Sequence, residues 1–119
     1  MIKFYYNTAP NPTKVALCLE EMGLSYELVP VDTRKGEQHT PSFLAINPNA
    51  KVPAIVDDGV TVFDSNAILL YLAEKTGKFL PGTSLASRAS VAPLMVLHAS
   101  RTLYAGTQVL FCSAMTLGA

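Results

Sequence analysis

The strongest constraint on the fold is an Asp-Gly turn between two short apolar runs. The runs are Ala54–Val56 and Val60–Phe63, and Asp57-Asp58-Gly59 separates them. An Asp-Gly pair flanked by apolar runs predicts a β-hairpin. Pro53 stands at the entry to the first run, where its missing N–H costs a strand least. The chain is therefore expected to contain an antiparallel pair of strands.

A polar pair, Asp64-Ser65, follows the hairpin and opens a helix that we expect to run from Ser65 to Thr76. Either polar residue can cap this helix, whose first backbone N–H groups have no partner within it. The same N–H groups form a site for a carboxylate or a phosphate. The stretch therefore sets an extended backbone edge beside an anion-binding helix start.

The residues before the hairpin predict two strands and two helices. In the first helix, Val15, Leu19 and Met22 recur at helical spacing. Asn11 is expected to cap that helix, and Gly23 is expected to end it. The expected elements are a strand at Ile2–Tyr6, a helix at Thr13–Met22, a strand at Tyr26–Val31, a loop at Asp32–Thr40 and a short helix at Pro41–Ile46.

The resulting order is β-α-β, a short helix, and then β-β-α. The first two strands should be parallel because a helix joins them. The last two must be antiparallel because a tight turn joins them. A mixed four-stranded sheet with helices packed on it is the thioredoxin-like arrangement, so the expected fold class is α/β.

Composition excludes several classes of protein. The chain has 119 residues, a formal charge of zero and no basic run, so nucleic acid is not an expected partner. No apolar stretch reaches the roughly 18 residues of a membrane-spanning helix, and the start does not resemble a signal peptide. Cys18 and Cys112 form no C-x-x-C pair, so we expect no metal site. These features favour a cytoplasmic protein without a membrane partner.

Four segments carry a more specific pattern, namely FYYNTAPNPTKV, LEEMGLSYE, NPNAKVPAIVDDG and FDSNAILLYLAEKTG. In this order and spacing they resemble the N-terminal domain of the cytosolic glutathione S-transferases. VPAI followed by DSxAI is the specific part. The PNxxK and KGxQ pieces are most similar to the bacterial branch that includes glutathione-dependent disulfide-bond oxidoreductases. The resemblance implies a thioredoxin-like domain over residues 1–81 and the start of a helical domain over residues 82–119.

The resemblance also implies a glutathione site, with glutathione as co-substrate and no cofactor. In this family the proline after Val52 is cis, which would expose the backbone of Val52 to pair with the cysteinyl part of glutathione. Ser65 and the helix start behind it would hold the γ-glutamyl carboxylate, and Asp64 would take the γ-glutamyl amine. Gln38 and Lys51 would reach the other end of the peptide. The residues expected to bind glutathione are Gln38, Lys51, Val52, Pro53, Asp64 and Ser65.

The loop after the first strand is expected to face the glutathione sulfur. A donor aimed at sulfur favours the nucleophilic thiolate, and Thr8 and Asn11 are the local donors. The bacterial branch places its threonine one residue later, where this chain has Ala9. Either Thr8 substitutes through a small shift of the loop, or Asn11 carries the role alone. Both residues could also be turn and cap residues, and Gln38 and Lys51 could be solvated surface groups.

The implied reaction is attack of the glutathione thiolate on a small electrophile or on a disulfide. Complete family members form homodimers and add a helical domain that builds the pocket for the electrophile. Only the opening of that domain is recognisable in this sequence, so we expect a truncated chain. The open alternatives are a glutathione-dependent disulfide reductase and an inactive remnant that binds glutathione weakly or not at all.

Overall fold

A computed structural model describes residues 1–77 of the chain. The chain divides into two compact units, Met1–Leu69 and Leu70–Ala119. The predicted domain boundary after Pro81 and the helical segment at 82–119 lie outside the described residues, and both stay predictions.

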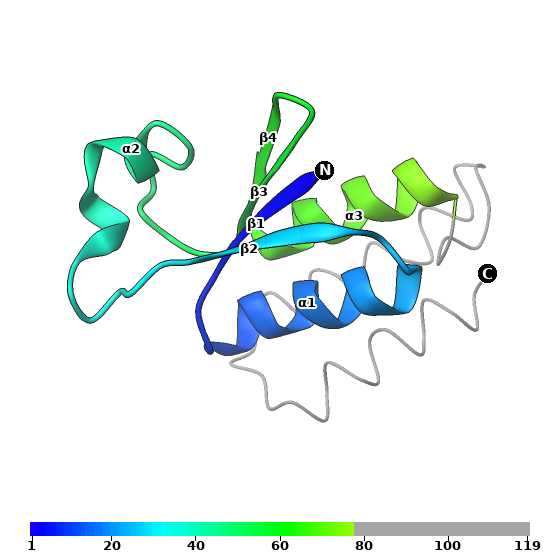
Figure 1. The fold of residues 1–119 in the computed structure, drawn as a ribbon, viewed down its shortest axis with the longest axis horizontal. Helices are drawn as coiled ribbons and strands as arrows, with labels where there is room; N and C mark the ends of the chain where they lie inside the picture. The colour runs from blue at the N-terminus through cyan, green and yellow to red at the C-terminus, as the bar shows by residue number, and fades with distance from the viewer. Residues whose placement is uncertain (78–119) are drawn as a thin grey trace. The chain divides into compact units, whose positions relative to one another are not determined.

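A mixed four-stranded sheet organises the first unit (Figure 1). β1 lies in the middle, parallel to β2 and antiparallel to β3, and β3 is antiparallel to β4. This arrangement confirms the predicted α/β, thioredoxin-like fold class. The strands are β1 (Ile2–Tyr6), β2 (Tyr26–Pro30), β3 (Ala54–Asp57) and β4 (Val60–Phe63), in the spatial order β2-β1-β3-β4.

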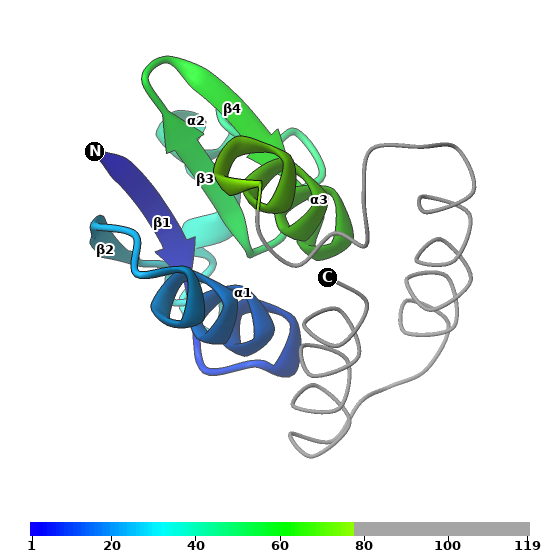
Figure 2. The same ribbon diagram turned by 90° about the vertical axis from the view of Figure 1, so that its right-hand side faces the viewer.

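Helices lie on both faces of this sheet. α1 (Pro10–Met22) and the first turn of α3 (Ser65–Thr76) cover one face, and α2 (Pro41–Leu44) lies on the other (Figure 2). The segment predicted as a loop before α2 contains a short 3-10 helix, η1 (Glu37–His39). Three residues carry too little periodicity to distinguish such a helix from a loop. α2 is also shorter than predicted.

Helix α1 begins earlier than the sequence predicted. Ala9 precedes its first residue, Pro10, and no side chain caps it. The N–H of Thr13 donates to the carbonyl oxygen of Ala9 at 3.2 Å, which starts the helical hydrogen bonding. The assignment of Asn11 as the cap was therefore wrong, because Pro10 fits the first helical position as well as Pro12 does. Asn11 lies inside the first turn instead.

The predicted end of α1 is confirmed. Gly23 adopts a left-handed conformation, with φ of 66°, which costs glycine little. Its N–H donates to the carbonyl oxygen of Glu20 at 3.0 Å, and the N–H of Leu24 donates to the carbonyl oxygen of Leu19 at 3.1 Å. This pair of bonds closes the last turn and satisfies carbonyl groups that the helix leaves open.

The core has a part on each face of the sheet. On the α1 side, Phe4 and Ile55 are adjacent across β1 and β3 and are fully buried, as are Val15 and Leu19 of α1. Cys18 is buried there too, as predicted. On the α2 side a smaller group, which we call the α2 cluster, fixes the segment before β3. The α2 cluster consists of Val31, Phe43 and Ala54, with Tyr5, Ile46 and Val52 packed against it.

Candidate functional site

A hollow of about 380 Å³ collects most of the residues that the sequence predicted for a site. We call it the polar hollow. It combines the first turn of α1, the segment before β3, the end of β4 and the start of α3. The residues that line it are Asn11, Asn47, Asn49, Lys51, Val52, Pro53, Phe63, Asp64 and Ser65.

Asn47 holds the segment before β3 in place, although the sequence analysis gave it no such role. Its side chain is 2% exposed. Its Nδ2 donates to the carbonyl oxygen of Lys51 at 2.8 Å, and its Oδ1 accepts from the N–H of Asn49 at 2.9 Å. Ala50, which stands between Asn49 and Lys51, has φ of 54°. The Val52–Pro53 peptide bond that follows is cis. Asn47 thus fixes the backbone that carries Lys51 and Val52 into the polar hollow.

Asp64 caps α3 and therefore settles which of the two predicted residues does so. Its Oδ2 accepts from the N–H of Ala67 at 3.2 Å, and its carbonyl oxygen accepts from the N–H of Ile68 at 2.9 Å. Asp64 is exposed, with φ of 75°, whereas Ser65 is 5% exposed. Ser65 consequently lines the polar hollow where the helix presents its N-terminal N–H groups.

A buried lysine, also missed from the sequence, connects α1 to the start of α3. Lys14 is 1% exposed, and its Nζ donates to Oδ1 of Asn66 at 2.9 Å. Burying an amine is costly unless it is hydrogen-bonded, so this contact stabilises the pairing of the two helices. Lys14 stands four residues before Cys18, so both lie on the buried side of α1. That spacing was the sequence signal that could have predicted the burial of Lys14.

Two of the predicted residues lie outside the polar hollow. Thr8 lines a neighbouring hollow of about 580 Å³, together with Asn7 and Thr33. Asn7 shapes that loop, because its Nδ2 donates to Oγ1 of Thr33 at 3.2 Å and its Oδ1 accepts from the N–H of Ala9 at 2.9 Å. Gln38 lies in η1, and its Oε1 is buried without a hydrogen-bond partner among the described residues.

The polar hollow carries both signs of charge and an apolar wall. Lys51 and Asp64 are its charged lining residues, and both are exposed. Phe63, at the end of β4, is 37% exposed and supplies apolar surface. Within residues 1–77 no three His, Cys, Asp or Glu side chains are grouped to hold a metal ion. That part of the chain also contains no helix long and apolar enough to cross a membrane.

The first 74 residues match the family described as glutathione S-transferase, N-terminal domain. The chain belongs to this family. It is 54% identical over 87 residues to the disulfide-bond oxidoreductase YfcG of Escherichia coli, a match that covers 67% of this chain and 40% of the relative. It is 51% identical over 69 residues to glutathione S-transferase 2 of Schizosaccharomyces pombe, covering 56% of this chain and 30% of the relative. The chain thus spans less than half the length of these relatives.

Solved structures of this family are similar to the chain. A glutathione transferase family member from Pseudomonas fluorescens, solved with two glutathione bound, superposes with a TM-score of 0.78 at 37% identity. That match covers 83% of this chain and 46% of the other. Ure2p in complex with S-hexylglutathione gives a TM-score of 0.76 at 33% identity, over 83% of this chain and 48% of the other. The resemblance noted from the sequence is confirmed at the level of the family and the fold.

Proposed function

We propose that the polar hollow binds glutathione and activates its thiol for attack on an electrophile. One observation carries this proposal: residues assigned to different parts of glutathione from separate sequence segments line a single hollow. The family membership supports it, and so do the similar structures that hold glutathione or S-hexylglutathione.

The charges around the polar hollow complement those of glutathione, a short peptide with two carboxylates and one amine. In the proposed pose the γ-glutamyl carboxylate accepts from the Ser65 hydroxyl and from the first N–H groups of α3. The γ-glutamyl amine donates to Asp64, whose carboxylate has acceptor sites beyond the one that Ala67 uses. The glycyl carboxylate faces Lys51. Gln38 also stays a candidate for that end, where the N–H groups of its side-chain amide would donate to the carboxylate.

The cysteinyl part of glutathione pairs with the backbone of Val52 in this pose, as an added strand does. Its sulfur then lies toward Asn11, which lines the same hollow as Val52. Thr8 lines the neighbouring hollow. We therefore assign the hydrogen bond to sulfur to the Asn11 amide rather than to Thr8. An N–H donated to sulfur favours the thiolate and lowers the pKa of the bound thiol.

A disulfide is the second candidate for the other substrate. The relative that is 54% identical is a disulfide-bond oxidoreductase, which favours this alternative. Cys18, the cysteine among the described residues, is buried, so glutathione would supply the reactive thiol. The bound thiolate attacks one sulfur of the disulfide and releases the other as a thiolate. A second glutathione thiolate then attacks the mixed disulfide, giving glutathione disulfide and the second substrate thiol.

Calorimetric titration of the whole chain with glutathione tests the binding proposal. Saturable binding is expected, and Ser65→Ala should weaken it by about tenfold because a hydrogen bond to a carboxylate is lost. Ser25→Ala is the matched control, since Ser25 is exposed and lies away from the polar hollow. An unchanged affinity in Ser65→Ala would show that Ser65 does not bind the γ-glutamyl carboxylate. A folded chain that does not bind glutathione would favour the inactive remnant.

Turnover assays then separate the two reactions. Reduction of a small disulfide without activity on an aryl halide would favour the reductase, and the reverse pattern would favour the transferase. Binding with neither activity would leave the chain as a glutathione-binding module.

A further inference from the structure

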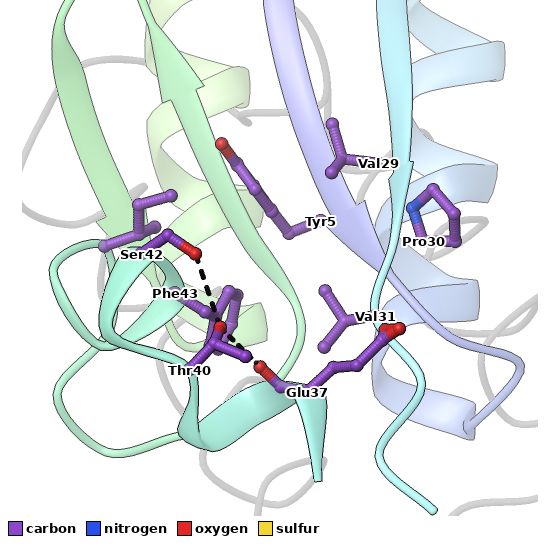
Figure 3. Close-up of a pocket in the computed structure, with 9 residues that line it drawn as sticks. Tyr5, Val29, Pro30, Val31, Glu37, Thr40, Ser42 and Phe43 are labelled. Carbon is purple, nitrogen blue, oxygen red and sulfur yellow. Dashed lines mark hydrogen bonds between the residues drawn. The ribbon is translucent and has the colours of Figure 1, made fainter. Parts of the chain in front are cut away.

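A third hollow lies beside the end of β2, between that strand, η1 and α2 (Figure 3). We call it the β2–α2 hollow. Its volume is about 380 Å³, within the ~300–1,000 Å³ typical of small-molecule sites. None of the residues that line it also lines the polar hollow. A ligand held there would therefore occupy a site separate from the proposed glutathione site.

Two aromatic rings and two valines give the β2–α2 hollow apolar walls. The rings of Tyr5 and Phe43 have centroids 5.8 Å apart and are tilted by 56°. Val29 and Val31 of the β2 side face them across the hollow (Figure 3). Phe43 and Val31 are 4% and 5% exposed and belong to the α2 cluster. Their packing within this cluster holds these two side chains in place beside the hollow.

The directions of the hydrogen bonds make the polar side of this hollow rich in acceptors. Thr40 has one hydroxyl proton, which it donates to the carbonyl oxygen of Glu37 at 2.8 Å. In the 3.4 Å contact between the hydroxyls of Thr40 and Ser42, Ser42 must then be the donor. The lone pairs of Ser42 consequently stay available to a ligand.

Glu37 adds a negative charge to this set of acceptors. Its Oε2 accepts from the N–H of Asp32 at 2.9 Å, and its carboxylate lies beside Val31 in Figure 3. Among the described residues that line the β2–α2 hollow, it is the one with a charge. An anionic ligand would be repelled there, whereas a cation that donates hydrogen bonds is complementary.

We propose that the β2–α2 hollow binds small primary amines with an aromatic or aliphatic body, as their ammonium cations. The ammonium group donates to the Glu37 carboxylate at the β2 side of the hollow. The apolar body packs against Tyr5, Phe43 and the valines.

The test is a titration of the whole chain, followed by 1H–15N NMR, with phenethylammonium and with phenethyl alcohol as its neutral counterpart. Saturable shifts are expected at the amides of Val31, Thr40 and Phe43, with the amine binding more tightly than the alcohol. Glu37→Gln should weaken amine binding by about threefold and leave the alcohol unaffected, since exposed ion pairs are modest in strength. Glutamine keeps an acceptor for the N–H of Asp32, so the variant should retain the fold.

Two further variants complete the test. Glu21→Gln removes the same charge from an exposed position on α1 and should leave amine binding unchanged. Ser42→Ala removes an acceptor on the α2 side, away from the Glu37 carboxylate, and should leave the preference for the amine over the alcohol unchanged. Equal affinities for amine and alcohol, an unchanged amine affinity in Glu37→Gln, or shifts confined to the polar hollow would each overturn the proposal. These outcomes do not depend on whether glutathione binds.

Discussion

Asn11 is the residue on which thiol activation depends in the proposed function. Replacing it with alanine removes an N–H donor from the polar hollow. The pKa of the thiol of bound glutathione should therefore rise by about one unit, toward the ordinary thiol value of about 8.5. Thr8→Ala should change this pKa less, because Thr8 lines the neighbouring hollow. Ultraviolet absorbance of the thiolate, followed against pH with glutathione bound, measures both values.

The control for this pair is helix content, which circular dichroism reports. Alanine is a good helix former, so Asn11→Ala should leave α1 intact. A larger rise in pKa for Thr8→Ala than for Asn11→Ala would mean that the loop shifts on binding and brings Thr8 to the sulfur. If the pKa of the bound thiol changes in neither variant, the side chains of these two residues do not activate the thiol.

Ala50 carries local backbone strain beside the polar hollow. Its φ of 54° lies in the left-handed region, which costs a residue with a Cβ roughly 1 kcal/mol. Ala50→Gly should therefore leave the free energy of unfolding unchanged or raise it by about 0.5–1 kcal/mol. Ala16→Gly, inside α1, is the matched control and should lower it by about 1 kcal/mol. Denaturant unfolding measures both, and equal losses in the two variants would contradict the prediction.

At the scale of elements, a contact between the end of α1 and the start of β2 is sensitive to pH. The Tyr26 hydroxyl donates to the Glu20 carboxylate. This hydrogen bond, together with burial and the charge of Glu20, raises the pKa of Tyr26 above its ordinary value of 10.0. Below about pH 10 the folded and unfolded chains both keep the proton, so the contribution to stability is intact. Above it the unfolded chain loses the proton first, and the contribution declines as the pH approaches the folded-state pKa.

Tyr26→Phe removes this pH dependence. The difference in free energy of unfolding between the wild type and the variant should shrink as the pH rises from about 9 to about 11. Every other residue is the same in both proteins, so the difference isolates Tyr26. A difference that stays constant with pH would show that the Glu20 contact does not perturb this hydroxyl.

Elements governed by adjacent residues were predictable from the sequence. Asp58 and Gly59 have φ of 48° and 83°, as a two-residue hairpin turn requires, so local chemistry fixes the reversal between β3 and β4. Gly23 ends α1 for a similar local reason. The start of α1 was not determined in this way. Pro10 and Pro12 both suit the first turn, and the sequence pattern does not distinguish between them.

That several candidate residues would lie together was predictable where the family pattern named them. Residues whose partners are distant side chains or backbone groups were not predictable. Lys14 contacts Asn66 across two helices, and no local pattern pairs these residues. Asn47 acts through the carbonyl oxygen of Lys51, which carries no sequence signal of its own. Thr8 and Asn11 looked equivalent as donors. Their separation into two hollows depends on the path of the loop into α1.

At the scale of the whole molecule, the polar hollow unites segments that are far apart in the sequence. Asn11 comes from α1, Asn47–Pro53 precedes β3, and Phe63–Ser65 joins β4 to α3. A ligand that contacts all three segments stabilises the folded chain by mass action, by about 2.7 kcal/mol at a concentration one hundred times its dissociation constant. Unfolding of any one segment would release the ligand, so the three should be stabilised together.

Hydrogen exchange of the whole chain with and without saturating glutathione measures this coupling. Protection is expected to increase in Asn47–Pro53 and in Phe63–Ser65 to a similar extent, because both lose the same open states when the ligand is bound. Asn47→Ala should reduce the increase in both segments, since it frees the backbone that carries Lys51 and Val52. Increased protection at Phe63–Ser65 alone would mean that the helix start binds a carboxylate without the strand-like pairing at Val52. Glutathione would then be held at one end, and its sulfur would not be positioned against Asn11.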